Sequence, residues 1–385
     1  MVKIDSFISK TTLTDYEQVG FSIELNLADG HAYQECTDCQ QKIVKRMSEI
    51  WHATEQQSIL AAEKSFIHCY GNLISSSGLS EVADSMILPT ASNSIDLVAS
   101  YLNHRNMKAL LTYPTFDNLA LLLHRRGVPI FPVTESELID PIYLRKNLSK
   151  VDALFLVNPN NPTGTNLKEY EFIHIVEECK RANKIIIIDA SFRLYYPQTW
   201  DSYKILNKTN SSYIIFEDTG KVFPTQDMKA SLLSCSADHM FMLRELYNEI
   251  YLCVSKFTLG VLSEFFAEAF TGVSPLVNFH EIVALRRKFL RNKINEKHID
   301  NNAKSSLIGV EWMRIPQFSL NDLEFVRKVQ TLGVAVLPGR NFFWANVGSP
   351  ETTNNFRISL MKPLGVFQQG VSILAEYLEH KGGGE

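Results

Sequence analysis

The chain lacks long apolar runs and any concentration of basic charge, and each absence excludes a class of function. No run approaches the roughly 20 apolar residues of a membrane span, and the start, Met1-Val-Lys-Ile-Asp-Ser6, has no apolar segment of signal-peptide length. The 38 basic and 42 acidic side chains are mixed along the sequence, with a formal net charge of −4, so no basic stripe suits a phosphate backbone. We therefore expect a soluble, cytoplasmic protein that binds neither membranes nor nucleic acid.

Cysteine is scarce and scattered. Of the six cysteines, only Cys36 and Cys39 have a CxxC spacing, without a second pair or a histidine at zinc-finger spacing. A metal or redox site at this pair is the alternative, but reduced thiols of an intracellular protein suit the pattern better. The sequence therefore predicts no metal site.

The chain does contain the alternating pattern of an α/β protein. Its 385 residues are too many for one simple core, and an apolar content of 45% suffices to bury two. From about residue 40 to 240, helical stretches alternate with short β-branched runs, as in βα units around a mainly parallel sheet. Consecutive apolar positions in these runs indicate strands covered on both faces. The clearest predicted strands are 109–113, 153–157, 184–189 and 213–216.

The pattern changes beyond residue 240, and we expect three parts in the chain. Residues 41–272 form a large domain that ends in one long or broken helix over 238–272. Residues 273–385 form a smaller α+β domain, and residues 1–40, with little periodic structure, form a lid or arm that joins it and covers a site. Within the smaller domain the pattern predicts helices near 277–297 and 321–332, strands near 305–314, 334–339 and 356–360, a final helix, and a flexible tail at 382–385.

Lys221 is the most informative residue in the large domain. It follows a strand-like run that ends in an acidic turn, and Lys229 lies eight residues later. A buried lysine with a lowered pKa can form a Schiff base with the aldehyde of pyridoxal phosphate, and a second cation nearby can reach the phosphate. The alternative is a solvated surface lysine, so the assignment depends on further cofactor contacts.

Two other strand ends supply such contacts. The run Asn158-Pro-Asn-Asn-Pro-Thr-Gly164 forms a rigid turn after a predicted strand, where open α/β sheets bind ligands, and leaves Asn161 to bond a cofactor oxygen. Asp189 ends a run of four isoleucines, where a buried carboxylate needs a cation such as a pyridinium nitrogen. The alternatives are a plain Asn-Pro turn and a helix N-cap.

A hydroxylated segment, Pro89-Thr-Ala-Ser-Asn-Ser94, precedes an apolar helical stretch over residues 95–102. A helix start presents N–H groups to an anion, so a phosphate can bind there. The alternative is that Ser92 or Ser94 only caps the helix. Phe116 is able to stack on a planar ring or to belong to the core.

In order along the chain, these residues resemble the landmarks of fold type I pyridoxal-phosphate enzymes, the aspartate aminotransferase superfamily. The landmarks are Asn161-Pro-Thr-Gly164, Asp189, Lys221 with Lys229, Val336-Leu-Pro-Gly339 and Arg357 in Phe356-Arg-Ile-Ser359. The resemblance implies a large domain with a mostly parallel sheet flanked by helices, and a smaller α+β domain. It also implies a homodimer, or a dimer of dimers, with sites at the interface.

Roles follow from this resemblance. It implies that Lys221 forms the Schiff base, Asp189 pairs with the pyridine nitrogen and Asn161 bonds the phenolic oxygen. Phe116 then stacks on the ring, and Arg357 binds the α-carboxylate of the substrate. The residues that hold the phosphate are Ser92, Asn93 and Lys229.

The departures from the superfamily pattern concern the same site. Phe192 stands where such enzymes commonly carry a tyrosine that bonds the cofactor, and Asp218 and Gly220 stand where serines commonly flank the lysine. A carboxylate three residues before Lys221 would repel a phosphate, so Asp218 is expected to face a cation.

With these departures, the runs Glu217–Lys229 and Leu27-Ala-Asp-Gly-His-Ala32 resemble a narrower group. These are the O2-using, pyridoxal-phosphate-dependent L-arginine oxidases, desaturases and hydroxylases of natural-product pathways such as those of indolmycin and enduracididine. The resemblance implies that Asp29 and Asp218 bind the guanidinium and that His31 works near the reacting carbons. It places Thr14 and Glu17 in an N-terminal lid. The alternatives are a common Asp-Gly turn and a structural histidine.

The expected function is therefore oxidation of L-arginine by an antibiotic-biosynthesis enzyme, with O2 as co-substrate. An oxidase or desaturase would release an unsaturated 2-imino or 2-oxo product and hydrogen peroxide, whereas a hydroxylase would give 4-hydroxy-2-oxoarginine. Two rivals remain: an ordinary class I/II aminotransferase, and a pyridoxal-phosphate-binding regulatory module without turnover.

Overall fold

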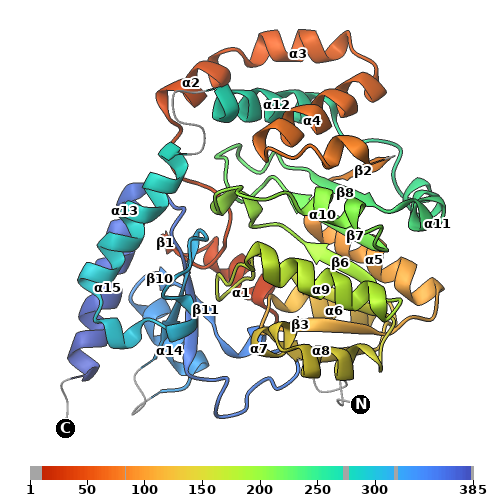
Figure 1. Ribbon diagram of the computed structural model, residues 1–385. Coiled ribbons are helices and arrows are strands. Elements are labelled where there is room, and N and C mark those ends of the chain that lie inside the picture. Colours follow the sequence, from red (N-terminus) through yellow and green to blue (C-terminus); the bar gives the residue numbers. More distant parts are fainter. Residues whose placement is uncertain (1–10, 83, 272–276, 316–319, 383–385) are drawn as a thin grey trace.

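A seven-stranded sheet lies at the centre of the molecule (Figure 1). The computed structural model describes residues 11–82, 84–271, 277–315 and 320–382. The sheet has the strand order β2-β8-β7-β6-β5-β3-β4. Its strands are β2 (Ser85–Leu88), β3 (Ala109–Tyr113), β4 (Ile130–Thr134), β5 (Ala153–Val157), β6 (Ile185–Asp189), β7 (Tyr213–Asp218) and β8 (Ser231–Cys235).

The sheet is mainly parallel, because only β8 runs against its neighbours. Leu88 of β2 and Asp218 of β7 both pair with Ser231, the first residue of β8. The carboxyl ends of the other six strands therefore meet the start of β8 at one edge of the sheet. Open α/β sheets bind their ligands outside this edge.

Both faces of the sheet are buried. Leu154, Leu156 and Ile186 belong to one buried cluster, and Phe155 and Ile187, at the alternate positions, belong to another. Each such side chain contributes roughly 1.5–3 kcal/mol when fully buried. This two-sided burial explains the continuous apolar runs from which the strands were predicted.

Eleven α-helices of the described chain lie between residues 38 and 271, and most of them pack around this sheet. In Figure 1, α12 lies against α2, α3 and α4 above one edge of the sheet. No helix in the described ranges is both long and apolar enough to span a membrane. The bounds are α2 (Asp38–Lys45), α3 (Met47–Glu55), α4 (Ile59–Leu73), α5 (Ala91–His104), α6 (Asp117–Arg125), α7 (Glu135–Ile139), α8 (Pro141–Leu148), α9 (Glu169–Arg181), α10 (Ser202–Lys208), α11 (Ala237–Asn248) and α12 (Lys256–Thr271).

The two ends of the chain are built together beside the large sheet. A three-stranded antiparallel sheet has the order β11-β12-β9. The N-terminal segment joins this region because β1 pairs in parallel with β10. The elements are α1 (Leu13–Gly20), β1 (Leu25–Asn26), α13 (Val277–Lys293), β9 (Val310–Arg314), α14 (Asp322–Thr331), β10 (Val334–Ala335), β11 (Leu337–Pro338), β12 (Asn355–Ser359) and α15 (Leu364–Gly382).

The α/β fold class predicted from the sequence is confirmed, and the four predicted strands correspond to β3, β5, β6 and β7. The helix predicted over 238–272 is broken, since residues 249–255 separate α11 from α12. Strands β2, β4 and β8 were not predicted from the sequence. Strand β4 contains Pro132, which is tolerated because β4 is an edge strand. The predicted boundary between 272 and 273 and most of the predicted tail lie outside the described residues.

Candidate active site

A cavity of about 270 Å³ lies at the carboxyl edge of the large sheet. Its wall is formed by strand ends of that sheet together with residues of α1, the segment after β1, and β12. Of the fourteen site residues predicted from the sequence, Asp29 and Asn93 are absent from this wall. The others line it: Thr14, Glu17, His31, Ser92, Phe116, Asn161, Asp189, Phe192, Asp218, Lys221, Lys229 and Arg357.

The turn after β7 brings a carboxylate and two amines to the cavity. Nζ of Lys221 lies 3.8 Å from Oδ2 of the buried Asp218, whose Oδ1 accepts the N–H of Gly220 at 2.8 Å. A Cβ at Gly220 would lie 2.8 Å from Cδ of Lys229, so glycine is what permits this close approach. The turn thereby holds Lys221 and Lys229 on the same wall.

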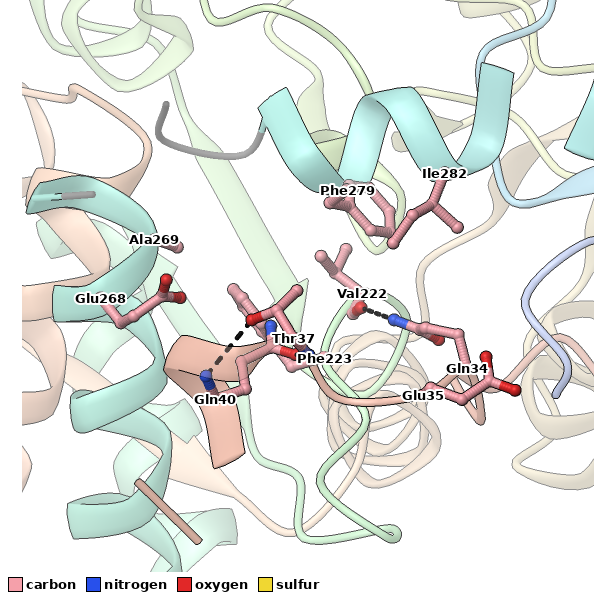
Figure 2. A pocket seen from close by; sticks show the side chains of 10 residues that line it. All are labelled: Gln34, Glu35, Thr37, Gln40, Val222, Phe223, Glu268, Ala269, Phe279 and Ile282. Carbon is pink, nitrogen blue, oxygen red and sulfur yellow. Dashed lines mark hydrogen bonds between the residues drawn. The ribbon is translucent and has the colours of Figure 1, made fainter. Parts of the chain in front are cut away.

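Two side chains hold the backbone at Lys221 by hydrogen bonds to carbonyl groups. The hydroxyl of Tyr195 donates to the carbonyl oxygen of Lys221 at 2.6 Å. Nε2 of Gln34 donates to the next carbonyl, that of Val222, at 2.8 Å, beside a small pocket of about 30 Å³ (Figure 2). These two bonds limit the freedom of the lysine's main chain and do not involve its amine. Neither Tyr195 nor Gln34 was predicted.

Asp189 ends β6 with a buried carboxyl group. Its Oδ1 accepts the N–H and the hydroxyl of Ser191, at 2.9 and 2.5 Å. Burial nevertheless raises the pKa of Asp189 to about 6, which means that the ionised form needs a cation beside it. Phe192 lines the same wall and stacks on Tyr195 with ring centroids 5.6 Å apart.

Arg357 reaches the cavity from β12. Nη1 donates to Oδ1 of Asn161 at 3.2 Å, and Nη2 donates to the carbonyl of Ala28 at 2.8 Å and to Oε1 of Glu17 at 3.3 Å. Within the described chain, its buried Nε–H has no acceptor. The guanidinium lies over the ring of Phe116, 5.6 Å from the centroid. A planar cation with a free donor suits a substrate carboxylate.

Helix α5 begins at the cavity. Its N-cap is Thr90, rather than Ser92 or Ser94. Oγ1 of Thr90 accepts the N–H of Asn93 at 3.2 Å and donates to Oδ1 of Asn93 at 2.7 Å. Asn93 is thereby engaged in the helix start, whereas Thr90, Ala91 and Ser92 line the cavity. The N–H groups of a first helical turn lack partners within the helix and attract anions.

The loop that carries Asn161 is held by Glu135 at the start of α7. Its Oε1 accepts from Nδ2 of Asn160 and from the hydroxyl of Thr163, each at 2.6 Å. Its Oε2 accepts from the hydroxyl of Thr165 at 2.9 Å. One carboxylate therefore fixes the turn on both sides of Asn161, and no local pattern around Glu135 signals this.

Asp29 lies behind the cavity wall, 1% exposed. Its carboxylate forms an ion pair with the buried Lys362 and accepts from Nδ2 of Asn26 at 2.9 Å. Its Oδ1 also accepts the N–H of His31 at 3.2 Å. In this arrangement Asp29 positions His31, and its contact with a substrate guanidinium stays a prediction.

Comparison with known proteins places the chain in a family. The family model described as aminotransferase class I and II matches residues 17–366. The chain belongs to the class I and II aminotransferase family. It is accordingly a pyridoxal-phosphate-dependent enzyme on the aminotransferase fold, as predicted from the landmark residues.

The curated relatives of this chain are distant in sequence. Histidinol-phosphate aminotransferase 2 of Mannheimia succiniciproducens is 28% identical over 108 residues, which is 28% of this chain and 31% of that protein. The Pasteurella multocida protein of the same name is 23% identical over 231 residues, 58% of this chain and 60% of that protein. The chain thus matches less than two thirds of the length of either relative.

Solved structures of the family match over most of their length. The structure of MppP soaked with the product 2-ketoarginine has a TM-score of 0.85 and 29% identity, covering 92% of this chain and 99% of that chain. An archaeal alanine:glyoxylate aminotransferase has a TM-score of 0.80 at 14% identity, covering 99% and 98% of the two chains. The second likeness concerns the fold alone.

The cavity of this family member fits pyridoxal phosphate. Asp189 is a buried carboxylate that needs a cation, and the pyridinium nitrogen is one. The start of α5 and the amine of Lys229 line the same cavity and would suit the phosphate. Oγ1 of Thr115, on the cavity wall, is buried without a hydrogen-bond partner among the described residues, so one more polar contact is available there.

Helix α1 brings Thr14 and Glu17 to the cavity, and Asp117 holds its first turn. Oδ2 of Asp117 accepts the N–H of Leu13 at 2.9 Å, and Nδ2 of Asn341 donates to the carbonyl of Thr11 at 2.8 Å. The side chain of Leu13 is fully buried. The helix is therefore fastened at its N-terminus, over the cavity.

Asp117 makes the stability of this family member depend on pH. Burial raises its pKa from 3.8 to about 7. Between about pH 4 and pH 7 the folded protein keeps a proton on Asp117 that the unfolded chain has lost. The stability that this group contributes is therefore complete below about pH 4. It is lost as the pH rises through about 7. Asp117→Asn, which cannot ionise, should gain apparent free energy of unfolding relative to the wild type across this window, by roughly 1.4 kcal/mol per pH unit. Urea denaturation of both proteins at several pH values measures the difference, and a constant difference would contradict it.

Proposed function

We propose that the enzyme oxidises L-arginine, using pyridoxal phosphate and O2. The observation that carries the proposal is the Asp218 carboxylate beside Lys221, in a cavity that offers Arg357 to a substrate carboxylate. With the substrate's carboxylate at Arg357 and its amine at the cofactor, Asp218 is left to pair with a cationic side chain. A guanidinium suits it, because its planar donors stay protonated and each charged hydrogen bond contributes roughly 1.5–3 kcal/mol.

The cofactor would be held by residues on the cavity wall. Lys221 would hold its aldehyde carbon, Asp189 its pyridine nitrogen and Asn161 its phenolic oxygen. Phe116 would stack on its ring, and Ser92, Lys229 and the start of α5 would bind its phosphate. When bound, pyridoxal phosphate supplies an electron sink next to the α-carbon of the substrate.

The chain's own groups would then move the protons. Nζ of Lys221, released when the substrate amine takes its place, removes the α-proton. His31 accepts a later proton from the substrate side chain, and Thr14 and Glu17 close the cavity over the reaction. Each two-electron oxidation of the substrate passes two electrons and two protons to O2, so the second product is hydrogen peroxide. The likeness to MppP, whose solved structure was soaked with the product 2-ketoarginine, supports an arginine-derived product.

An oxygen electrode tests the proposal directly. The holoenzyme should consume O2 on addition of arginine, more slowly with homoarginine, and least with lysine and ornithine, whose ammonium groups lack the planar donors. Catalase should return half of the consumed O2, because two peroxides give one O2. If no O2 is consumed and the amino group is transferred to a 2-oxo acid, the proposal is rejected and the protein is an ordinary aminotransferase. Aminotransfer is the activity named for the histidinol-phosphate relatives.

Desaturation and hydroxylation share these proton transfers and differ in whether water adds to the side chain. We propose the oxidase or desaturase outcome. Mass spectrometry of the product formed in ¹⁸O-labelled water decides between them: label at the 2-oxo group alone supports the proposal, and label on a side-chain carbon indicates the 4-hydroxylase.

A further inference from the structure

His31, which lines the cavity, forms a hydrogen-bonded cluster with Tyr33 and Asp227. Nδ1 of His31 lies 3.2 Å from Oδ1 of Asp227 and 3.3 Å from the hydroxyl oxygen of Tyr33. The hydroxyl of Tyr33 donates to Oδ2 of Asp227 at 2.8 Å. Asp227 comes from the turn after Lys221, so the cluster joins the N-terminal segment to the segment that carries the cofactor lysine.

The hydrogen atoms of this cluster can be assigned from its geometry. The single hydroxyl hydrogen of Tyr33 is directed to Asp227, which leaves only acceptor capacity toward the imidazole. Oδ1 of Asp227, as a carboxylate oxygen, is also an acceptor. Both neighbours of Nδ1 on His31 therefore accept, so Nδ1 must carry a hydrogen.

Burial, together with the charges of Lys221 and Lys229, lowers the pKa of His31, so the neutral imidazole is favoured. A neutral imidazole has one N–H, and Nδ1 holds it. Nε2, on a ring that lines the cavity, is left with a lone pair, and no group of the described chain donates to it. This is the tautomer in which Nε2 is able to accept a proton.

We propose that Asp227, supported by Tyr33, is a positioning residue that fixes the Nδ1–H tautomer of His31 and thereby makes Nε2 a second proton acceptor of the site, beside Lys221. The use of that acceptor on the arginine side chain rests on the proposed function, but the tautomer does not. In the transfer, the proton of a substrate C–H bond moves to Nε2 and the bonding electrons stay on the substrate. The carboxylate of Asp227 then faces the resulting imidazolium, as an orienting carboxylate does in other acid–base pairs.

The backbone of Asp227 suits this task and its test. Its φ is 64°, a left-handed conformation in which aspartate and asparagine are several-fold enriched. The turn is closed by the N–H of Met228, which donates to the carbonyl of Thr225 at 3.1 Å. Asp227→Asn is therefore expected to fold with this turn intact, while it removes the charge and turns one of the two acceptors into a donor.

Nuclear magnetic resonance of the holoenzyme labelled with ¹⁵N-histidine, without arginine, reads the tautomer directly. The His31 signals are assigned by their loss in His31→Gln. We expect the ¹⁵N shift of a protonated Nδ1 and of a bare Nε2 in the wild type. In Asp227→Asn the ratio of Nδ1–H to Nε2–H should fall by about tenfold or more, the equivalent of one charged hydrogen bond. A wild-type His31 protonated at Nε2, or an unchanged ratio in Asp227→Asn, overturns the proposal.

Two further variants separate the carboxylate from its surroundings. Tyr33→Phe leaves Asp227 as an acceptor and should keep the Nδ1–H tautomer, whereas loss of that tautomer would assign the role to the hydroxyl instead. Asp38→Asn, an equal charge change at an exposed position of α2, should leave the His31 signals unmoved. Because none of these measurements uses arginine, an enzyme that failed to consume O2 would reject the proposed function without affecting the tautomer.

Discussion

Lys221→Ala is expected to abolish the visible absorbance of lysine-bound cofactor and to reduce turnover by about 10³-fold or more. The variant lacks both the amine that holds the aldehyde and the base that removes the α-proton, and a general base alone contributes about 10²–10⁴-fold. The start of α5 and Lys229 would still bind the phosphate, so cofactor should remain bound without the covalent link. Absorbance spectra and single-turnover kinetics of the purified variant measure both effects.

Lys204→Ala is a suitable control for this result, because Lys204 is an exposed residue of α10. It should retain the spectrum and the rate of the wild type. The cavity contains a second amine, that of Lys229. If Lys221→Ala kept the lysine-bound absorbance and Lys229→Ala lost it, the assignment of the two lysines would be reversed.

Asp218→Asn is expected to raise the arginine KM by about 10- to 100-fold, with the cofactor still bound. The variant loses the charged hydrogen bond to the guanidinium, worth roughly 1.5–3 kcal/mol, because the amide nitrogen of asparagine can only donate. Oδ1 of the asparagine can still accept the N–H of Gly220, which Asp218 accepts at 2.8 Å, so the turn that carries Lys221 should keep its shape. Steady-state kinetics and cofactor titration separate the two effects.

Citrulline, a neutral isostere of arginine, provides the matched substrate for this variant. The wild type should strongly prefer arginine to citrulline, and Asp218→Asn should reduce the preference by about the factor by which it raises the arginine KM. If both substrates lost activity equally, or if the variant released its cofactor, Asp218 would serve the cofactor site rather than the substrate.

The part of the site that apolar patterning predicted consists of strand ends, whereas Thr14, Glu17, His31 and Arg357 were predicted from the family resemblance. Asn161, Asp189 and Lys221 each follow an apolar run, and parallel strands bring their carboxyl ends to one edge. Local sequence contains this information, because the strand and the residue after it are neighbours in the chain. The same holds for the core strands β5 and β6, whose apolar runs are continuous.

The residues that the sequence did not reveal act across long separations. Asp117 holds Leu13, Glu135 holds the loop around Asn161, and Lys362 pairs with Asp29. Each is a single polar residue without a periodic or motif context, and its role exists only once distant segments meet. Strands β2 and β8 also gave no signal, since their pairing with neighbours, rather than their own composition, defines them.

The pairing of β1 with β10 bears on the order in which the protein assembles. Leu25 and Asn26 pair with Val334 and Ala335, so this contact joins opposite ends of the chain and forms only after the C-terminal region has been synthesised. Contacts of such long sequence separation cost the most loop-closure entropy and form slowly. We therefore expect the large sheet, with Lys221, to form before the segment that bears Thr14, Glu17 and His31 reaches its place. A nascent chain would therefore be able to hold its cofactor before it could distinguish a substrate.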